Sequence, residues 1–525
     1  MIQVTGTQKA SNRATAGNAS GNISGNISRN IYSGVLGGII GLACTTATVI
    51  SVGGTGAMAQ PLLWSLARTE EGSAMEKARG DRTQTTEPSL QEPFLKEPLL
   101  QALSFQNTSL QNQPLPDQSL QANAGGTIQM AGRRAIVQPE VRSIWLDRET
   151  IVNAGSPQGL AKVFERFKAA GINTVFVETV NAGYPIYPST VAPEQNPLIN
   201  GWDPLQAAVE LGKSHNIEVH AWVWLFAAGN QAHNRIVGQP ASYPGPILSA
   251  RPDWAGYDNH GNLIIPGQTK TFLDPANPEV RQYLFDILSE VAGRYDVDGI
   301  QFDYVRYPFQ DPNANRLFGY GTAAREEFKS LTGVDPIDLS PKNGGDPRRA
   351  YYWNQWVTYR TQKITSFVAE ASQRLRHQKP GITISAAVFA DGTHKRQHTI
   401  HQDWEDWADQ SLVDWIVLMS YASNTQQFED LIRPWVVESS YRATRVIPGI
   451  RLLNLPTAAA ADQLQLLRRF TTNGYALFAA DNLNSAVQQM LAEVHAGDEE
   501  IVVLDGGGSA IASNQNTTTS TAAEQ

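Results

Sequence analysis

Eight short segments rich in β-branched and aromatic residues, each bounded by turn residues, alternate with helix-like segments between residues 140 and 480. This alternation constrains the fold more than any other feature of the chain, because strands joined by helical crossovers pair in parallel. The strand-like segments are residues 140–146, 173–179, 217–226, 298–304, 382–389, 414–421, 445–451 and 474–480.

Helical signals lie between most of these segments. Residues 158–171 repeat apolar side chains with a 3.6-residue period and end at Gly171, and residues 278–295 begin with Pro278, a residue favoured in a first helical turn. Eight strand–helix units predict an α/β fold of the (β/α)8 TIM-barrel type, with residues 136–504 as the barrel domain. An open doubly wound sheet is the alternative, but no G-x-G-x-x-G motif follows any of the strands.

The first 59 residues have a different composition. They contain a polar start, the apolar run YSGVLGGIIGLACTTATVISV and the pattern Ala57-Met58-Ala59, which is typical of a signal peptide cleaved before Gln60. An uncleaved N-terminal membrane anchor is the alternative, since the run is about long enough to cross a bilayer. Both interpretations predict an exported domain, in the periplasm or cell envelope, and the segment would be its only contact with the membrane if it stays uncleaved.

The other flanking segments and the charge balance limit the partners of the chain. Residues 60–135, rich in Gln, Pro and Ser, and residues 505–525 are expected to be a disordered linker and tail, because they bury too little apolar surface to offset their ordering entropy. The single cysteine, Cys44, lies in the apolar run, so no disulfide or thiolate metal site is expected in the barrel. The net charge of −9 and the lack of a basic stripe argue against a nucleic-acid partner. No cofactor or metal is predicted.

The stretch VDGIQFDYVRYP, residues 297–308, places two acids in the fourth strand. Side chains alternate along a strand, so Gln301 and Asp303 share the face that we expect to point into the barrel. A carboxylate inside a barrel is unfavourable unless it is paired or used, which makes Asp303 a candidate catalytic group. An ion pair with Arg306 is the structural alternative. Asp298, at the start of the strand, is expected to be a cap or turn residue.

Other candidates lie near the ends of strands, where the active sites of such barrels are found. Glu178 is the best candidate for a second carboxylate. His220, Trp222 and Trp224 share one face of the third strand, and aromatic rings there would stack on sugar C–H surfaces unless they only fill the core. Residues 309–350 are interpreted as a long loop that forms a lid or cleft wall. Further candidates for ligand contact are Asn181, Tyr304, Arg306, Asp391, Tyr421 and Asp481.

Acids, amides and aromatic residues without a metal or phosphate motif point to a carbohydrate ligand. Cleavage of a glycoside needs a proton donor and either a second carboxylate or an assisting group of the substrate. The sequence therefore predicts a glycoside hydrolase, with Asp303 and Glu178 as the catalytic pair. In this prediction Trp222, Trp224 and Tyr421 are sugar platforms, and His220 and Arg306 bind hydroxyl, acetamido or lactyl groups. The separation of the two carboxyl groups, and so retention or inversion, stays open.

At these residues the chain resembles the glycosyl-hydrolase-like 10 family, from about residue 140 to 480. The resemblance is carried by RSIWLDRET, GINTVFVETVNAGYPIYPS, WDPLQAAVELGKSHNIEVHAWVW and DWIVLMSYA, and most specifically by the block from Leu273 to Pro308. It implies a TIM-barrel glycosidase of the bacterial envelope that cuts peptidoglycan glycan strands stripped of their peptides. Many members of the family have FDDYFYP where this chain has FDYVRYP, so Tyr304 replaces an acid and Arg306 is introduced, a departure that implies altered specificity.

DGIQFDYV and LMSYA are also similar, more distantly, to two motifs of family 18 chitinases. Asp298 and Asp303 match acids of the first motif, and Tyr421 matches the tyrosine of the second. The catalytic glutamate of the first motif falls at Val305, which cannot donate a proton. This gap motivates one alternative to an exported hydrolase of peptidoglycan glycan, namely a non-catalytic envelope module that binds glycan. A hydrolase of an exopolysaccharide such as a deacetylated glucosamine polymer is a separate alternative.

Overall fold

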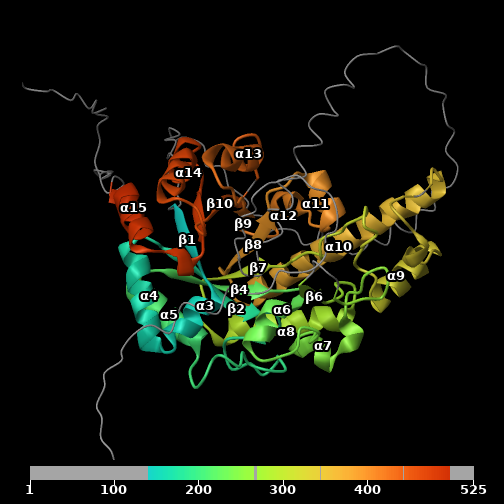
Figure 1. The fold of residues 1–525 in the computed structure, drawn as a ribbon, viewed down its shortest axis with the longest axis horizontal. Coiled ribbons are helices and arrows are strands. Elements are labelled where there is room, and N and C mark those ends of the chain that lie inside the picture. The colour runs from blue at the N-terminus through green and yellow to red at the C-terminus, as the bar shows by residue number, and fades with distance from the viewer. Residues whose placement is uncertain (1–139, 265–268, 343, 442, 497–525) are drawn as a thin grey trace, which may run out of the picture. The chain divides into compact units, whose positions relative to one another are not determined.

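A closed barrel of eight parallel strands, with helices around its outside, forms the structure (Figure 1), a computed structural model that describes residues 140–264, 269–342, 344–441 and 443–496. β11 pairs with β1 and closes the ring. The barrel strands are β1 (Val141–Leu146), β2 (Thr174–Asn181), β4 (Glu218–Trp224), β7 (Gly299–Asp303), β8 (Thr383–Phe389), β9 (Trp415–Met419), β10 (Arg445–Arg451) and β11 (Gly474–Phe478). Each predicted segment overlaps one of them, so the TIM-barrel prediction is confirmed. The predicted leader, linker and tail, residues 1–59, 60–135 and 505–525, lie outside the described residues.

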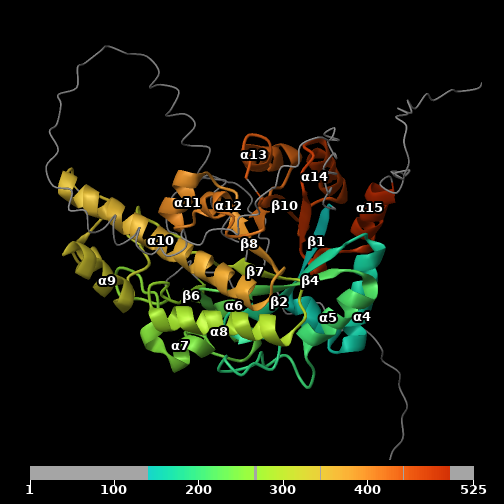
Figure 2. The same cartoon turned by 180° about the vertical axis from the view of Figure 1, so that it is seen from behind.

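The outer helices begin at residues that satisfy their first free N–H groups. Ser156 accepts a hydrogen bond from the backbone of Gly159 at the start of α4, and Asn277 accepts two from the start of α8. Figure 2 shows α8 and α10 beside each other, where Arg281 donates to Glu370. The helices that cover the barrel are α3 (Arg148–Ala154), α4 (Pro157–Ala169), α5 (Pro204–His215), α8 (Pro278–Arg294), α10 (Pro347–Gln378), α12 (Trp404–Asp409), α13 (Thr425–Val436), α14 (Thr457–Arg469) and α15 (Ser485–Ala496).

Aromatic side chains fill the barrel interior below its mouth. The ring of Trp145 lies 5.4 Å from that of Phe176 and 5.6 Å from that of Phe478, measured between centroids. The indole Nε1–H of Trp145 donates to Oε1 of Gln301 at 2.6 Å, which shows that Gln301 faces inward as the alternation predicts. This packed layer is the floor of the site, since it leaves the strand ends above it as the place for polar groups.

Two insertions add structure at the ends of the strands. Between β4 and α8 the chain forms β5 (Ala227–Asn230), α6 (Gln231–Ile236), α7 (Pro246–Ala250), the 3-10 helix η2 (Pro252–Trp254) and β6 (Lys270–Phe272), and β5 pairs with β6 in an antiparallel ribbon. β3 (Tyr184–Pro185) pairs with the end of β2.

Residues 309–350 were expected to be a long loop, and this expectation is wrong in part. The segment contains α9 (Thr322–Thr332), the 3-10 helix η3 (Pro336–Asp338) and the first turn of α10. Phe328 of α9 packs against Trp356 of α10, with their ring centroids 5.0 Å apart, in a second apolar cluster. Among the described residues, α10 and the other helices are all too short or too polar to cross a membrane.

Candidate active site

The carboxyl ends of β2, β4 and β7 bring the two predicted catalytic acids to one end of the barrel. Glu178 pairs in register with Trp222, and Trp224 pairs with Asp303. Because β4 lies between β2 and β7, the backbones that carry the acids are two strand spacings apart, on the order of 10 Å. Glu178 is 4% exposed and Asp303 is 8% exposed. The fold therefore holds both carboxyl groups in the upper interior with little contact to solvent.

Asp303 is held by two hydrogen bonds and not by an ion pair. Its Oδ2 accepts from the indole Nε1–H of Trp222 at 2.9 Å, and its Oδ1 accepts from the backbone N–H of Tyr304 at 2.6 Å. Within the described residues it forms no ion pair with Arg306, so the structural alternative is not realised. Burial raises the pKa of Asp303, while the two hydrogen bonds and the charges of Arg306 and Lys270 oppose this rise.

The backbone turns sharply directly after Asp303. Tyr304 has a φ of 50°, in the left-handed region, which for a residue with a side chain is unfavourable by roughly 1–2 kcal/mol. Its ring lies over that of Trp224, with centroids 4.2 Å apart and planes inclined by 36°. Tyr304 is half-buried. Strained backbone of this kind is concentrated at functional sites, and here it directs an N–H at the carboxylate and a ring at the mouth.

Glu178 is fixed from the other side. Its Oε2 accepts from the backbone N–H of Arg148 at 2.6 Å, at the first residue of α3, and its Oε1 accepts from the side-chain amide of Asn181. Burial raises the pKa of Glu178 to about 7, because desolvation outweighs the charge of Arg148 and these hydrogen bonds. A carboxyl group with this pKa exchanges a proton near neutral pH, which is the property required of a general acid.

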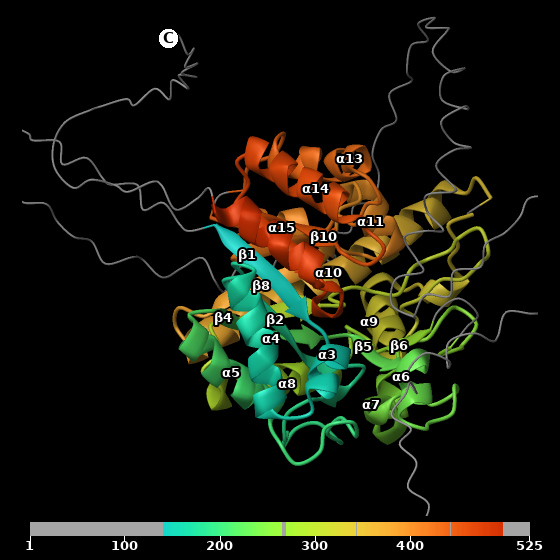
Figure 3. The same cartoon turned by 60° about the vertical axis from the view of Figure 1, so that its left-hand side comes forward.

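Further polar residues around Glu178 were missed by the sequence analysis. Arg148 contacts Nδ1 of His233, the two nitrogens lying 2.6 Å apart, and Figure 3 shows their helices α3 and α6 beside each other. Burial lowers the pKa of His233 to about 3, so the imidazole is neutral and accepts from the guanidinium. The only sequence signal for these polar residues is a position close to a strand end, as for Arg148 in RSIWLDRET. Asp481, in contrast, was predicted as a ligand contact: it is exposed at this end of the barrel, and desolvation and the neighbouring Asp147 raise its pKa to about 6.

The predicted ligand-contact residues divide by position. Tyr421 is half-buried, with its ring centroid 5.6 Å from that of Phe478, and burial together with the charge of Asp303 raises its pKa, so it belongs to the same site. Asp391 lies in the loop two residues after β8, where it forms an ion pair with Lys395 at 3.0 Å.

His220 lies away from this group. It is fully buried, its ring is stacked 4.8 Å from that of Trp415, and it pairs in register with Gly299, the first residue of β7. The predicted ligand contact of His220 is not supported by this position, because Trp222 and Trp224 lie between it and the mouth. Asp298 accepts from the backbone N–H of Val219 at 2.8 Å, which fits the structural role predicted for it.

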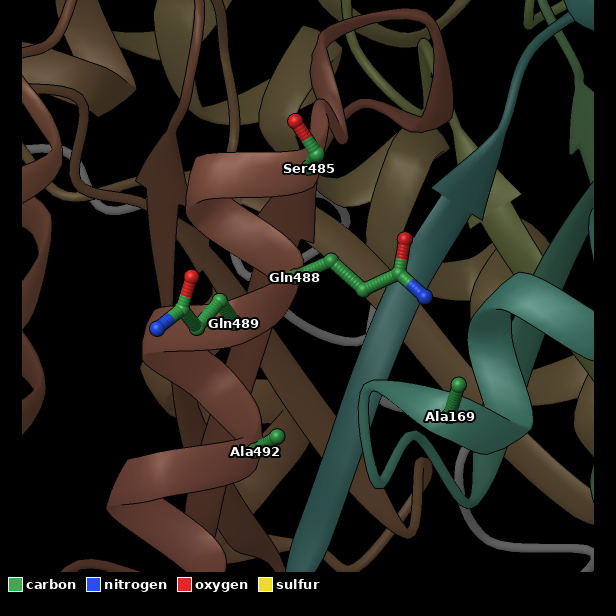
Figure 4. A pocket seen from close by; sticks show the side chains of 5 residues that line it. All are labelled: Ala169, Ser485, Gln488, Gln489 and Ala492. Carbon is green, nitrogen blue, oxygen red and sulfur yellow. The ribbon is translucent and has the colours of Figure 1, made fainter.

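Other places in the described part of the chain are less suited to be an active site. A hollow of about 330 Å³ between α4 and α15 is lined by small and amide side chains (Figure 4), and these are Ala169, Ser485, Gln488, Gln489 and Ala492. No cluster of three or more His, Cys, Asp or Glu side chains that could hold a metal ion is found in the described ranges. The strand ends of β2, β4 and β7 therefore remain the candidate site.

Comparison with known proteins decides the family. A family model described as glycosyl hydrolase-like 10 matches residues 140–465. The chain belongs to this family. With the barrel and its paired acids, membership makes the protein a glycoside hydrolase.

Named relatives agree with this assignment. The glycosyl hydrolase DigH of Escherichia coli strain K12 is 24% identical over 338 residues, which cover 59% of this chain and 69% of DigH. The glycosyl hydrolase YngK of Bacillus subtilis strain 168 is 25% identical over 342 residues, covering 59% and 60%. The PgaB (BpsB) glycoside hydrolase domain of Bordetella bronchiseptica superimposes with a TM-score of 0.50 at 13% identity, over 67% of this chain and 98% of that domain, and this likeness shows the fold alone.

Proposed function

We propose that this glycoside hydrolase acts outside the cytoplasm on a β-linked amino-sugar polymer, with peptidoglycan glycan strands as its substrate. The observation that carries the proposal is the pair of buried carboxyl groups, Glu178 and Asp303, on inward faces of strands separated only by β4. The family supports cleavage of a glycosidic bond. The choice of polymer rests on the resemblance of the block from Leu273 to Pro308, and export rests on residues 1–59.

The two acids have different roles in this proposal. Glu178, whose pKa burial raises to about 7, donates its proton to the glycosidic oxygen as the bond from that oxygen to the anomeric carbon breaks. Asp303 faces two cations, Arg306 and Lys270, that favour its ionised form. As a carboxylate it stabilises the positive charge that develops on the sugar ring, and it either attacks the anomeric carbon or takes a proton from the attacking water.

The aromatic residues divide between positioning and binding. Trp222 donates to Asp303 and packs on Trp145, with ring centroids 6.5 Å apart, so it is a positioning residue. Tyr304, whose ring packs against that of the buried Trp224, is better placed to receive a sugar face, since Tyr304 is partly exposed.

Release of soluble fragments from peptide-free glycan tests the proposal. The purified protein should release them, and Asp303→Asn should lower the rate by roughly 100- to 10,000-fold, the contribution of a group that takes part in proton transfer. Asp296→Asn is the matched control, because Asp296 is exposed and bound to Lys213 and Lys379 far from the strand ends. Equal release by Asp303→Asn and the wild type would remove Asp303 from the catalytic role.

The same assay separates the alternatives. The absence of a glutamate at position 305 motivates the alternative of a glycan-binding module without activity, and pull-down on peptidoglycan without any cleavage after long incubation would support that alternative. Faster cleavage of a deacetylated glucosamine polymer than of peptidoglycan glycan would favour the exopolysaccharide hydrolase.

Fractionation of the native host, with mass spectrometry of the N-terminus, tests export, and a mature N-terminus at Gln60 is the expected result.

A further inference from the structure

Two buried cations lie beside the stacked rings at the mouth. Lys270 comes from β6 and is 7% exposed, and its Nζ lies 5.6 Å from the ring centroid of Tyr304 and 6.0 Å from that of Trp224. Arg306 is 6% exposed, and its Cζ lies 5.0 Å from the ring centroid of Tyr304. Two separate segments, the β5–β6 ribbon and the turn after β7, therefore bring both positive charges to one aromatic ring.

These charges have few polar partners inside the protein. Within the described residues, the side chain of Lys270 makes no hydrogen bond and no ion pair, and its Nζ lies over the two aromatic rings. Arg306 donates from Nη1 to the backbone oxygen of Tyr307 at 2.9 Å, and four rings surround its guanidinium. A buried charge without a paired opposite charge is strongly unfavourable, and two neighbouring like charges increase the penalty.

Asp303 is the nearest acid, and it does not neutralise the pair. Both its oxygens already accept hydrogen bonds from Trp222 and from the backbone of Tyr304, and among the described residues no nitrogen of either cation forms an ion pair with it. Even when Asp303 is ionised, the three groups carry one net positive charge. The site therefore favours an anion supplied from outside the chain.

We propose that Lys270 and Arg306 form a subsite for a carboxylate carried by the substrate. This inference rests on the proposed function and narrows it: the enzyme selects amino-sugar units that bear an acidic side group, such as the lactyl ether of N-acetylmuramic acid, over neutral units. A sugar stacked on the partly exposed ring of Tyr304 would present that group to the two cations. A guanidinium matches the planar geometry of a carboxylate, and the surrounding rings exclude competing water.

Calorimetry with small sugars tests the subsite without requiring cleavage. The wild type should bind N-acetylmuramic acid roughly 10- to 100-fold more tightly than its methyl ester, the range expected for hydrogen bonds to charged groups. Lys270→Met keeps the length of the apolar stem and should bring this ratio close to one, whereas Lys270→Arg should keep most of it. Lys213→Met is the matched control, because Lys213 is exposed and far from the mouth. At position 306 the variant is Arg306→Lys, because it retains the positive charge, whereas a variant without this charge could fail to fold.

Hydrolysis supplies the second readout. The two substrates are native peptide-free glycan and the same glycan with its lactyl carboxyl groups reduced to alcohols. The wild type should cleave the reduced glycan more slowly than the native one. Lys270→Met should cleave the two glycans at similar rates. Equal binding of acid and ester by the wild type would overturn the inference. The inference would also be overturned if Lys270→Met lost the same fraction of wild-type activity on both glycans, since the two cations would then act only through Asp303.

The two proposals fail differently. Preference for the acid over the ester, without cleavage of either glycan, would keep the subsite and refute hydrolysis of peptidoglycan. Cleavage of both glycans at the same rate would keep the hydrolase and refute the subsite.

Discussion

Replacing Glu178 by glutamine should stabilise the fold at neutral pH while it removes the proposed proton donor. The site can accept the amide without losing a hydrogen bond. In the Glu178→Gln variant the side-chain oxygen would accept from the backbone N–H of Arg148, and Asn181, whose buried Oδ1 has no partner among the described residues, would turn its amide to accept from the new NH₂ group. Loss of activity would then reflect the lost proton and not a lost fold.

The size of the effect follows from the pKa of Glu178. Burial raises this pKa from 4.5 to about 7, and at 1.36 kcal/mol for each pKa unit the difference corresponds to about 3 kcal/mol. Below pH 4.5 the carboxyl is protonated in both the folded and the unfolded chain, so it has no effect on stability. As the pH rises to about 7, only the unfolded chain releases the proton, and the wild type loses stability. Above pH 7 the loss is complete.

Chemical denaturation of the wild type and Glu178→Gln across pH 4 to 8.5 measures this difference. The free energies of unfolding should coincide near pH 4, and the variant should be more stable by about 3 kcal/mol at pH 8. Asp296→Asn is the contrasting control, because hydrogen bonds from Lys213 and Lys379 lower the pKa of Asp296 to about 2 and its replacement should not stabilise the fold. A variant that is no more stable than the wild type at pH 8 would refute the assignment of Glu178 as a buried acid with a raised pKa.

Two further predictions concern the Asp303 side of the site. Trp222→Phe removes the hydrogen bond to Asp303 but keeps an aromatic ring, so kcat should fall roughly 10- to 100-fold. The acid limb of the pH–rate profile should move to higher pH, because this bond lowers the pKa of Asp303, and an unmoved limb would count against a positioning role. Binding of N-acetylmuramic acid should weaken as the pH rises through about 8, because burial lowers the pKa of Lys270 to about 8 and only its protonated form attracts the carboxylate. Arg306, Asp303 and Tyr304 also face Lys270, so Lys270→Met must abolish the step in affinity if Lys270 causes it.

The barrel could be predicted because its signal is local and repeated. Each strand is a short run of β-branched or aromatic residues, and the eight predicted segments overlap the eight barrel strands. The inward direction of Gln301 and Asp303 also followed, because alternation along a strand is a property of the backbone. These features need only the neighbouring residues.

The position of a side chain along the barrel axis could not be predicted in the same way. His220, Trp222 and Trp224 share a face, but at about 3.3 Å per residue the first lies roughly 13 Å from the third along the strand. His220 therefore packs with Trp415 in the lower interior, and Trp224 reaches the mouth. A period of two predicts the face of a residue but not its level.

Lys270 was missed because no local pattern marks it. β6 has three residues, too few for a periodic signal, and its partner β5 begins at Ala227. The contact of Lys270 with Tyr304 depends on this ribbon and on the turn after β7. The backbone partner of Asp303 was not predictable for a related reason: Arg306, which follows closely in sequence, was the alternative partner, but the turn at Tyr304 supplies a backbone N–H in its place.

The left-handed backbone of Tyr304 also affects how position 304 can change. Glycine, asparagine and aspartate adopt this conformation at a lower energy than tyrosine, so a library selected only for thermal stability should enrich them at position 304. A library selected for turnover should retain an aromatic residue that stacks on Trp224. Opposite enrichment in the two selections would identify position 304 as one where folding and turnover impose opposing selection on the same codon.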